Sequence, residues 1–239
     1  MRLNHTPFFL QAAFVCKAVT PGRGQGSKRS IFTKKTGTAI CNLLIIILEA
    51  ISFVYLIWRD GFTTDMLVYY TRLSNLLALI AGILVLIYIF RNKESSFLPK
   101  WLMMFRYIVT IMLSITFIIS LFVLSRYVGL YKVMISEHLK FHHTLCPLIS
   151  AISFICFEKG ERLSLKDNFL STLPTLIYGI TMLILNAAYV LRGPYPFLLV
   201  YEQSVPTTIM WIIGIYFGTF LIGSMLRFLN VVIRPPGRG

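Results

Sequence analysis

Two stretches of this sequence place hydroxyl and imidazole side chains at one end of a long apolar run. They are residues 69–75, with the sequence YYTRLSN, and residues 141–147, with the sequence FHHTLCP. A hydroxyl is a weak nucleophile until a base takes its proton, and an imidazole is able to act as that base near neutral pH. Brought to the same depth, Thr71 and one of the two histidines would therefore form a nucleophile and its base.

A packing role is the alternative for each of these groups. Thr71, Ser74 and Asn75 share one helix face through their three- and four-residue spacing. A threonine in a membrane helix commonly hydrogen-bonds its own backbone four residues back, so spacing alone leaves both roles open for Thr71. Pro147 frees a backbone carbonyl inside the same apolar run, and the resulting kink would re-aim His143.

Two charged residues lie inside apolar runs at comparable depth. Glu49 belongs to the run 38–58 and Arg72 to the run 66–90. A charge near the centre of a membrane helix costs roughly 2.5–3.5 kcal/mol, and such residues normally face the bundle interior and pair. We therefore expect Glu49 and Arg72 to approach each other, either as an ion pair that fixes helix packing or as a binding pair in a water-filled cavity.

The composition is that of an integral membrane protein. The 239 residues are 56% hydrophobic and 13% charged, whereas a soluble domain carries about 25% charged residues. Mean hydropathy is +0.75. The net charge of +14 does not indicate nucleic-acid binding, because the basic residues occupy short loops and not one face or helix. It is typical of the retention of Lys and Arg on the cytoplasmic side.

Six apolar runs, each near the ~20 residues needed to cross a bilayer, predict an all-α bundle of six transmembrane helices. Their backbone polar groups must be satisfied internally, which favours helices. We expect residues 1–37 to form a flexible basic tail, 38–233 the transmembrane domain and 234–239 a C-terminal tail. The runs cover residues 38–58, 66–90, 101–127, 138–157, 168–191 and 206–230.

Basic residues gather in both tails and in the loops after the second and fourth runs. This bias predicts a multi-pass protein of the plasma membrane with both termini cytoplasmic. Thr71, His142, His143 and Asn186 then fall in the outer leaflet, with the loop that contains Tyr195 and Phe197 just above. The inner half is expected to hold far fewer polar groups.

The sequence shows no pattern for a metal or a cofactor. None of its four cysteines forms a CxxC pair, and no set of histidines and carboxylates has metal-ligand spacing. We therefore expect no metal site and no cofactor.

Three short motifs carry a resemblance to a known family. They are residues 70–77 (YTRLSNLL), 143–148 (HTLCPL) and 193–197 (GPYPF). In order and spacing the chain resembles, over about residues 38–230, the androgen-induced gene 1 family, which includes the androgen-dependent tissue-factor-pathway-inhibitor-regulating protein. It looks more similar still to the bacterial six-helix relatives of that family, whose function is unassigned.

The resemblance implies a specific chemistry. The eukaryotic members are membrane-embedded hydrolases that cleave fatty acid esters of hydroxy fatty acids with a threonine nucleophile and a histidine base. Carried over, Thr71 would be the nucleophile and His143 the base, with His142 as the alternative one position away.

Two functions follow as hypotheses. The first is hydrolysis of a lipid acyl ester, with Asn75, Arg72 or Asn186 stabilising the oxyanion. The second is a non-enzymatic binder or carrier of a lipid or small molecule that uses Glu49 and Arg72. Membrane lipids are the expected partners in both. The supporting or substrate-binding positions are Glu49, Arg72, Asn75, His142, Asn186, Tyr195 and Phe197.

Overall fold

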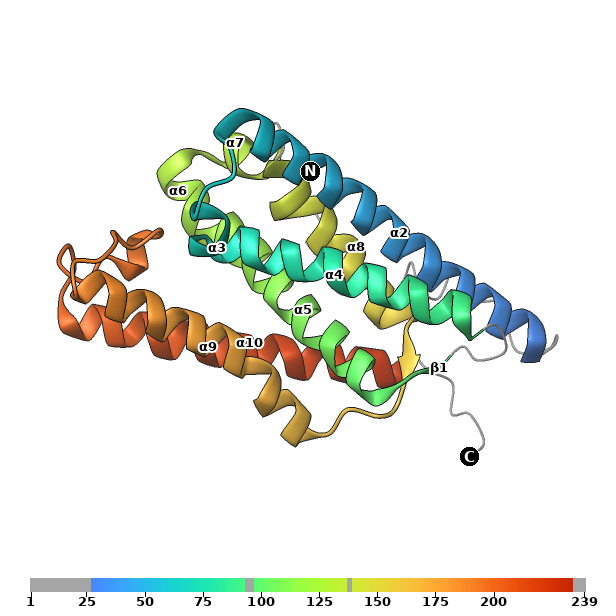
Figure 1. Ribbon diagram of the computed structural model, residues 1–239. Coiled ribbons are helices and arrows are strands. Elements are labelled where there is room, and N and C mark those ends of the chain that lie inside the picture. Colours follow the sequence, from blue (N-terminus) through green and yellow to red (C-terminus); the bar gives the residue numbers. More distant parts are fainter. Residues whose placement is uncertain (1–26, 93–96, 137–138, 234–239) are drawn as a thin grey trace, which may run out of the picture.

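The computed structural model describes residues 27–92, 97–136 and 139–233. Within them the chain is a helical bundle with one pair of two-residue strands (Figure 1). Five of the described helices are long and apolar enough to cross a membrane. They span Lys34–Asp60, Tyr70–Arg91, Lys100–Val128, Leu165–Ala187 and Val205–Val232.

The first half of the described chain forms three of these long helices. Their elements are α2 (Ser27–Asp60), α3 (Asp65–Val68), α4 (Tyr70–Arg91) and α5 (Lys100–Ile119), which continues through the π-helical turn η1 (Ser120–Leu124) into α6 (Ser125–Val128). A short helix, α7 (Leu130–Met134), follows.

The second half begins with a broken helix and ends with a helical pair. Its elements are η2 (Phe141–Leu145), α8 (Cys146–Ile152), η3 (Ser153–Phe157), α9 (Leu165–Ala187), the short 3-10 turn η4 (Pro196–Leu198) and α10 (Val205–Val232). Strand β1 (Phe97–Leu98) pairs in parallel with β2 (Lys159–Gly160).

The fourth apolar run differs from the prediction. It is a shorter apolar helix, Phe141–Phe157, with π-helical turns at both ends. Pro147 has no N–H to donate to the carbonyl four residues back, so the turn before it cannot close as a regular α-helix. The kink expected at Pro147 thus takes the form of the π-helical turn η2, directly before α8.

The first helix starts earlier than the apolar run predicts. Helix α2 begins at Ser27, so residues 27–37, expected as part of a flexible tail, are helical. Hydropathy marks the part of a helix that lipid surrounds, and a helix is free to continue beyond it through polar residues. Residues 1–26 of the predicted tail lie outside the described residues.

Two groups of helices make up the bundle. In Figure 1, α9 and α10 lie side by side along one edge, and α2, α4, α5 and α8 form the remainder. Helices α2 and α4 approach closely at Gly82, where a Cβ would lie 3.3 Å from the Asn42 carbonyl oxygen and 3.1 Å from the Ile46 side chain. The start of α2 and the end of α10 lie at the same end of the bundle as β1 (Figure 1).

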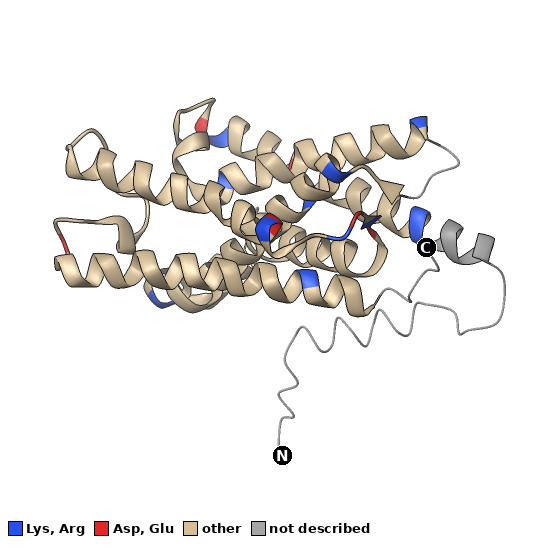
Figure 2. Ribbon diagram, turned by 90° about the horizontal axis from the view of Figure 1, so that it is seen from below, with Lys and Arg blue, Asp and Glu red and all other residues tan. Residues whose placement is uncertain are grey.

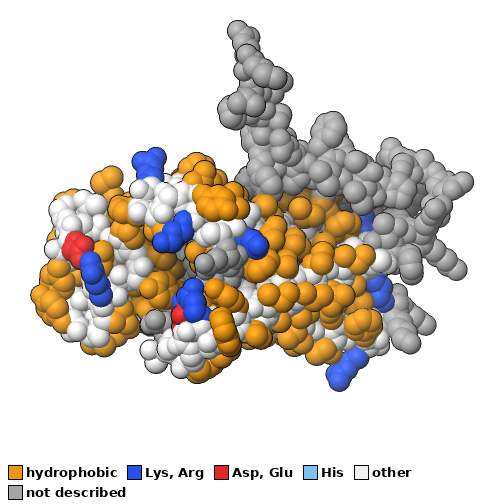
Figure 3. Space-filling model, turned by 90° about the horizontal axis from the view of Figure 1, so that it is seen from above, with side chains coloured by type: hydrophobic (Ala, Val, Ile, Leu, Met, Phe, Trp, Pro, Cys, Tyr) orange, Lys and Arg blue, Asp and Glu red, His pale blue; other side chains and the backbone are white. Residues whose placement is uncertain are grey.

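The outside of the bundle is apolar. Hydrophobic side chains cover much of the face shown in Figure 3, and charged residues are sparse along the helices in Figure 2. Large exposed apolar residues occur on all five long helices, such as Val54, Phe90, Trp101, Ile177 and Phe217. This surface suits lipid, in which exposed apolar groups carry no cost.

Candidate functional site

An apolar cavity of about 70 Å³ lies between the α9–α10 pair, the start of α4 and the end of α5. Most of its wall consists of aliphatic and aromatic side chains, among them Ile115, Leu183 and Trp211. Thr71, in the first turn of α4, and Tyr195 also line it. The cavity therefore offers a small apolar space with hydroxyl groups on its wall, of a volume well below that of a typical small-molecule pocket.

The hydroxyl of Thr71 is bonded to Tyr195. The phenol oxygen of Tyr195 lies 3.2 Å from Thr71 Oγ1 and accepts a hydrogen bond of the same length from the Thr71 backbone N–H. The Tyr195 ring stacks on Phe197, with centroids 5.3 Å apart, and Phe197 contacts Trp211. The structure thus brings the predicted residues Thr71, Tyr195 and Phe197 together at the cavity.

Burial keeps the Tyr195 phenol protonated. Tyr195 lies in the loop between α9 and α10, and its burial raises the pKa of the phenol above the ordinary value, while its hydrogen bonds with Thr71 act in the opposite direction. A protonated phenol is able to donate to Thr71 Oγ1 or to a ligand oxygen in the same place.

A second tyrosine, which the sequence did not single out, holds the same turn. Tyr178 of α9 accepts a hydrogen bond from the backbone N–H of Tyr70 and donates one to the carbonyl of Val68. The first N–H groups of a helix have no partner within the helix, so the two phenols of Tyr178 and Tyr195 satisfy the start of α4. Nothing in the sequence around Tyr178 indicates that its phenol bonds to the start of another helix.

The candidate base His143 is held by α7. Its Nδ1 lies 2.9 Å from the carbonyl oxygen of Val133. A carbonyl only accepts, so Nδ1 carries a hydrogen, and in the neutral form of the ring the lone pair is then on Nε2. This is the tautomer a base needs, but among the described residues the hydroxyl of Thr71 bonds Tyr195 and not His143.

Glu49 and Arg72 do not pair, which corrects the expectation from the sequence. Glu49 Oε2 lies 3.0 Å from Nε2 of His142, and both side chains are buried. Arg72 Nη2 lies 3.8 Å from the Asp60 carboxylate, and its guanidinium covers the ring of Tyr69 at 5.0 Å. The long side chain of Arg72 reaches the end of α2, where its charge is nearer to water.

The three predicted oxyanion donors have other partners, backbone groups for Asn75 and Asn186 and a carboxylate for Arg72. Asn75 Nδ2 donates to the carbonyls of Thr71 and His142, at 2.7 and 3.2 Å. Asn186 donates to the carbonyl of Leu191 and accepts from the N–H of Val200, so it holds the loop after α9. Arg72 is turned to Asp60. Near Thr71, the Tyr195 phenol is one donor that lines the cavity.

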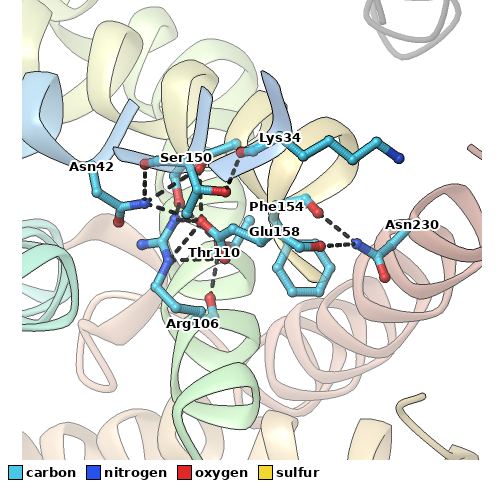
Figure 4. A network of polar contacts seen from close by, with 10 residues as sticks. Lys34, Asn42, Arg106, Thr110, Ser150, Phe154, Glu158 and Asn230 are labelled. Atoms are coloured by element: carbon cyan, nitrogen blue, oxygen red, sulfur yellow. Dashed lines mark hydrogen bonds and ion pairs between the residues drawn. The ribbon is translucent and has the colours of Figure 1, made fainter. Parts of the chain in front are cut away.

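The bundle also contains a buried polar network that was not predicted from the sequence (Figure 4). Arg106 of α5 donates to Glu158 from Nε and from Nη2, the latter at 2.8 Å, and both side chains are fully buried. Glu158 also accepts from Ser153 and Asn42. Arg106 is the residue from which the network could have been predicted, because it interrupts the apolar run 101–127. Glu158 gives no such indication, because it follows the end of the run 138–157 and resembles a loop residue.

No family model, curated protein or solved structure matches this chain. The resemblance carried by the three sequence motifs therefore stays a prediction.

Proposed function

We propose that this chain is a multi-pass membrane protein that binds the acyl chain of a membrane lipid in the cavity beside Thr71. The observation that carries the proposal is the composition of that cavity wall, which combines mostly apolar surface with several hydroxyl-bearing side chains, including Thr71 and Tyr195. Methylene groups meet apolar side chains there as they do in the bilayer, so the hydroxyl groups would supply the selectivity. The two hydroxyls would bind the carbonyl oxygen of an ester or carboxyl group.

Entry from the membrane suits the position of the cavity. Ile180, which lines it, is 45% exposed on the lipid-facing surface. Phe141–Phe157 is proposed as a sixth span, with both termini cytoplasmic and the cavity in the outer leaflet of the plasma membrane. The basic residues of the tails and of the loops after the second and fourth runs support this orientation.

Two glycines provide a matched test of acyl-chain binding. A Cβ at Gly179, in the cavity wall, or at Gly214, on α10 outside that wall, would meet no atom within 4 Å. Gly179→Leu fills the cavity, and Gly214→Leu adds the same group elsewhere. We expect a fluorescent long-chain acyl ester to bind saturably to the wild type and Gly214→Leu, and at least tenfold more weakly to Gly179→Leu. Equal binding by both variants would contradict the proposal.

Hydrolysis of that ester is the second candidate function. It is favoured by the Nδ1 contact of His143 with the Val133 carbonyl, which in the neutral form of the ring leaves the lone pair on Nε2, and by the Thr71 hydroxyl on the cavity wall. Thr71 Oγ1 would bond to the acyl carbon, its proton would pass to His143, and the alcohol would leave with that proton. Water would then release the fatty acid and restore Thr71, with Tyr195 donating to the oxyanion.

Hydrolysis requires the Thr71 hydroxyl to give up its hydrogen bond with Tyr195 and to form one with His143. Turnover of a fluorogenic long-chain acyl ester in detergent tests it. We expect Thr71→Ala and His143→Ala to abolish turnover, and Thr181→Ala, at an exposed position of α9, to retain it. Equal release by all four proteins would exclude hydrolysis and leave binding as the function.

A further inference from the structure

A second hollow, of about 350 Å³, adjoins the apolar cavity at the loop between α9 and α10. Leu198 lines the cavity, and the next residue, Leu199, lines the hollow. On α9, Leu183 lines the cavity, and Asn186, which lies about 4.5 Å farther along the helix axis, lines the hollow. This loop is at the end of the bundle opposite to β1 (Figure 1). A lipid that extends out of the cavity along α9 would therefore enter the hollow.

The wall of the hollow carries one charge of each sign. Arg192 Nη2 donates to Glu202 Oε1 at 2.7 Å, and the two side chains are 76% and 55% exposed. Water weakens an exposed ion pair, so a ligand is able to open it at little cost. The guanidinium would then bind phosphate oxygens through two parallel N–H groups, and the carboxylate would attract a cation. The hollow therefore suits a ligand that carries both charges.

Hydrogen bonds to the end of α9 fix the shape of the hollow. The buried Asn186 side chain donates to the carbonyl of Leu191 and accepts from the N–H of Val200. The phenol of Tyr201 donates to the carbonyl of Ala187. Both arms of the loop are thus joined to the helix. A preformed site loses less conformational freedom when a ligand binds, so this frame favours binding.

Tyr189 adopts a backbone conformation that favours glycine, with φ at +58°. It follows the end of α9 in a Schellman motif, in which the N–H of Val190 bonds to the carbonyl of Leu185 and its own N–H bonds to that of Asn186. Its ring stacks on Tyr201, with centroids 4.5 Å apart, and both rings line the hollow. An aromatic side chain thus occupies a position where the backbone alone prefers glycine. Strain of this kind is found at functional sites, and an aromatic face attracts cations.

We propose that the hollow binds the zwitterionic headgroup of a phospholipid, with the phosphate on Arg192 and the ammonium group on Glu202 beside the two tyrosine rings. The inference rests on the proposed function, because the acyl chain of the same lipid would occupy the adjoining cavity. Ethanolamine and choline headgroups share this chemistry. The ammonium group of the first donates N–H bonds to a carboxylate, whereas the quaternary group of the second has none to donate and is held by charge and by aromatic faces.

Competition by lipids that differ only in headgroup tests the site. The fluorescent acyl ester is displaced from the protein in detergent by lysophospholipids of one acyl chain with an ethanolamine, choline or glycerol headgroup, and by the corresponding monoacylglycerol. We expect a zwitterionic lipid to displace the ester at about tenfold lower concentration than the anionic glycerol lipid, and the stronger zwitterionic lipid identifies the headgroup. Equal displacement by all four would overturn the headgroup site and leave acyl binding intact. Absence of saturable ester binding would instead overturn the proposed function, and this inference with it.

The two charges should have separable effects in the same assay. Glu202→Gln should abolish the discrimination between zwitterionic and anionic lipids, and Arg192→Gln should weaken every phospholipid to the level of the monoacylglycerol. Arg126→Gln, which removes an exposed arginine of α6 outside the hollow, should change neither. Discrimination that survives in both Glu202→Gln and Arg192→Gln would overturn the assignment of the headgroup to this hollow.

Tyr189→Gly separates binding from folding. Glycine relieves the left-handed backbone conformation, so we expect a melting temperature no lower than that of the wild type. The affinity for the zwitterionic lipid should nevertheless fall, because the ring beside the ammonium group is gone. Unchanged affinity in Tyr189→Gly would overturn the role of the tyrosine pair in headgroup binding.

Discussion

Arg106 and Glu158 form an ion pair whose charged atoms lie 2.8 Å apart, with no exposed surface on either side chain. The pair joins α5 to the end of η3, and Asn42 of α2 contacts the same carboxylate. Asn230 of α10 donates to the backbone carbonyls of Phe154 and Glu158. Four parts of the bundle that are distant in sequence therefore meet at one polar centre.

Loss of one partner of this pair should destabilise the fold strongly. Arg106→Met leaves the Glu158 carboxylate buried without its cation, and we expect a loss of about 3–5 kcal/mol in the free energy of unfolding. The double variant Arg106→Met with Glu158→Met should recover part of that loss, because no unpaired charge remains. Denaturant unfolding in detergent measures both.

The exposed pair Lys100–Glu161, at 3.9 Å, is the control for that measurement. Lys100→Met should change stability by less than about 1 kcal/mol, because water screens an exposed pair. A small effect of Arg106→Met, comparable to that of Lys100→Met, would show that the buried pair does not hold the bundle together.

The close approach of α9 and α10 depends on Gly223. A Cβ there would overlap the side-chain oxygen of Asn168, which accepts a hydrogen bond from Tyr107. We expect Gly223→Ala to cost about 1–3 kcal/mol through overpacking. Gly218→Ala, on the same helix and with nothing within 4 Å of its Cβ, should be neutral or stabilising. Thermal unfolding of the two variants compares them, and equal melting temperatures would contradict the packing described.

The Tyr195 phenol should lower the free energy of unfolding at alkaline pH. Its pKa is raised in the folded state by burial, so the folded protein holds the proton more tightly than the unfolded chain, whose tyrosines titrate near ~10. Stability from this group is therefore complete below ~10 and is lost as pH rises further. Tyr195→Phe keeps the stacked ring without the hydroxyl. We expect the stability difference between wild type and Tyr195→Phe to fall above pH ~10, and a constant difference would contradict the assignment.

The proposed topology predicts which side of the membrane each loop occupies. A cysteine at Gln203, before α10, should react with a membrane-impermeant thiol reagent added to intact cells. A cysteine at Lys166, in the first turn of α9, should react only after the cells are permeabilised. The reverse pattern would place both termini outside the cell.

The sequence predicts the long helices well, because hydropathy reports which segments lipid can surround. It also predicts that Glu49 is buried, since a carboxyl group exposed to lipid is costly. It does not identify the partner of Glu49, because the choice between Arg72 and His142 depends on how helices distant in sequence pack. Tyr178 shows the same limit, since its bonds to the start of α4 exist only in the folded bundle. The burial of Glu158 was not predicted, because hydropathy does not identify a polar residue that packs into the core directly after an apolar run.

The most direct test of the central claim is photo-crosslinking with a lipid whose acyl chain ends in a diazirine. In membranes that contain the protein and a trace of this lipid, the account predicts labelling of cavity residues such as Ile115, Leu183 and Trp211, which Gly179→Leu abolishes and Gly214→Leu preserves. Labels confined to lipid-exposed positions such as Val54 and Phe90, unchanged by Gly179→Leu, would contradict acyl-chain binding in the cavity.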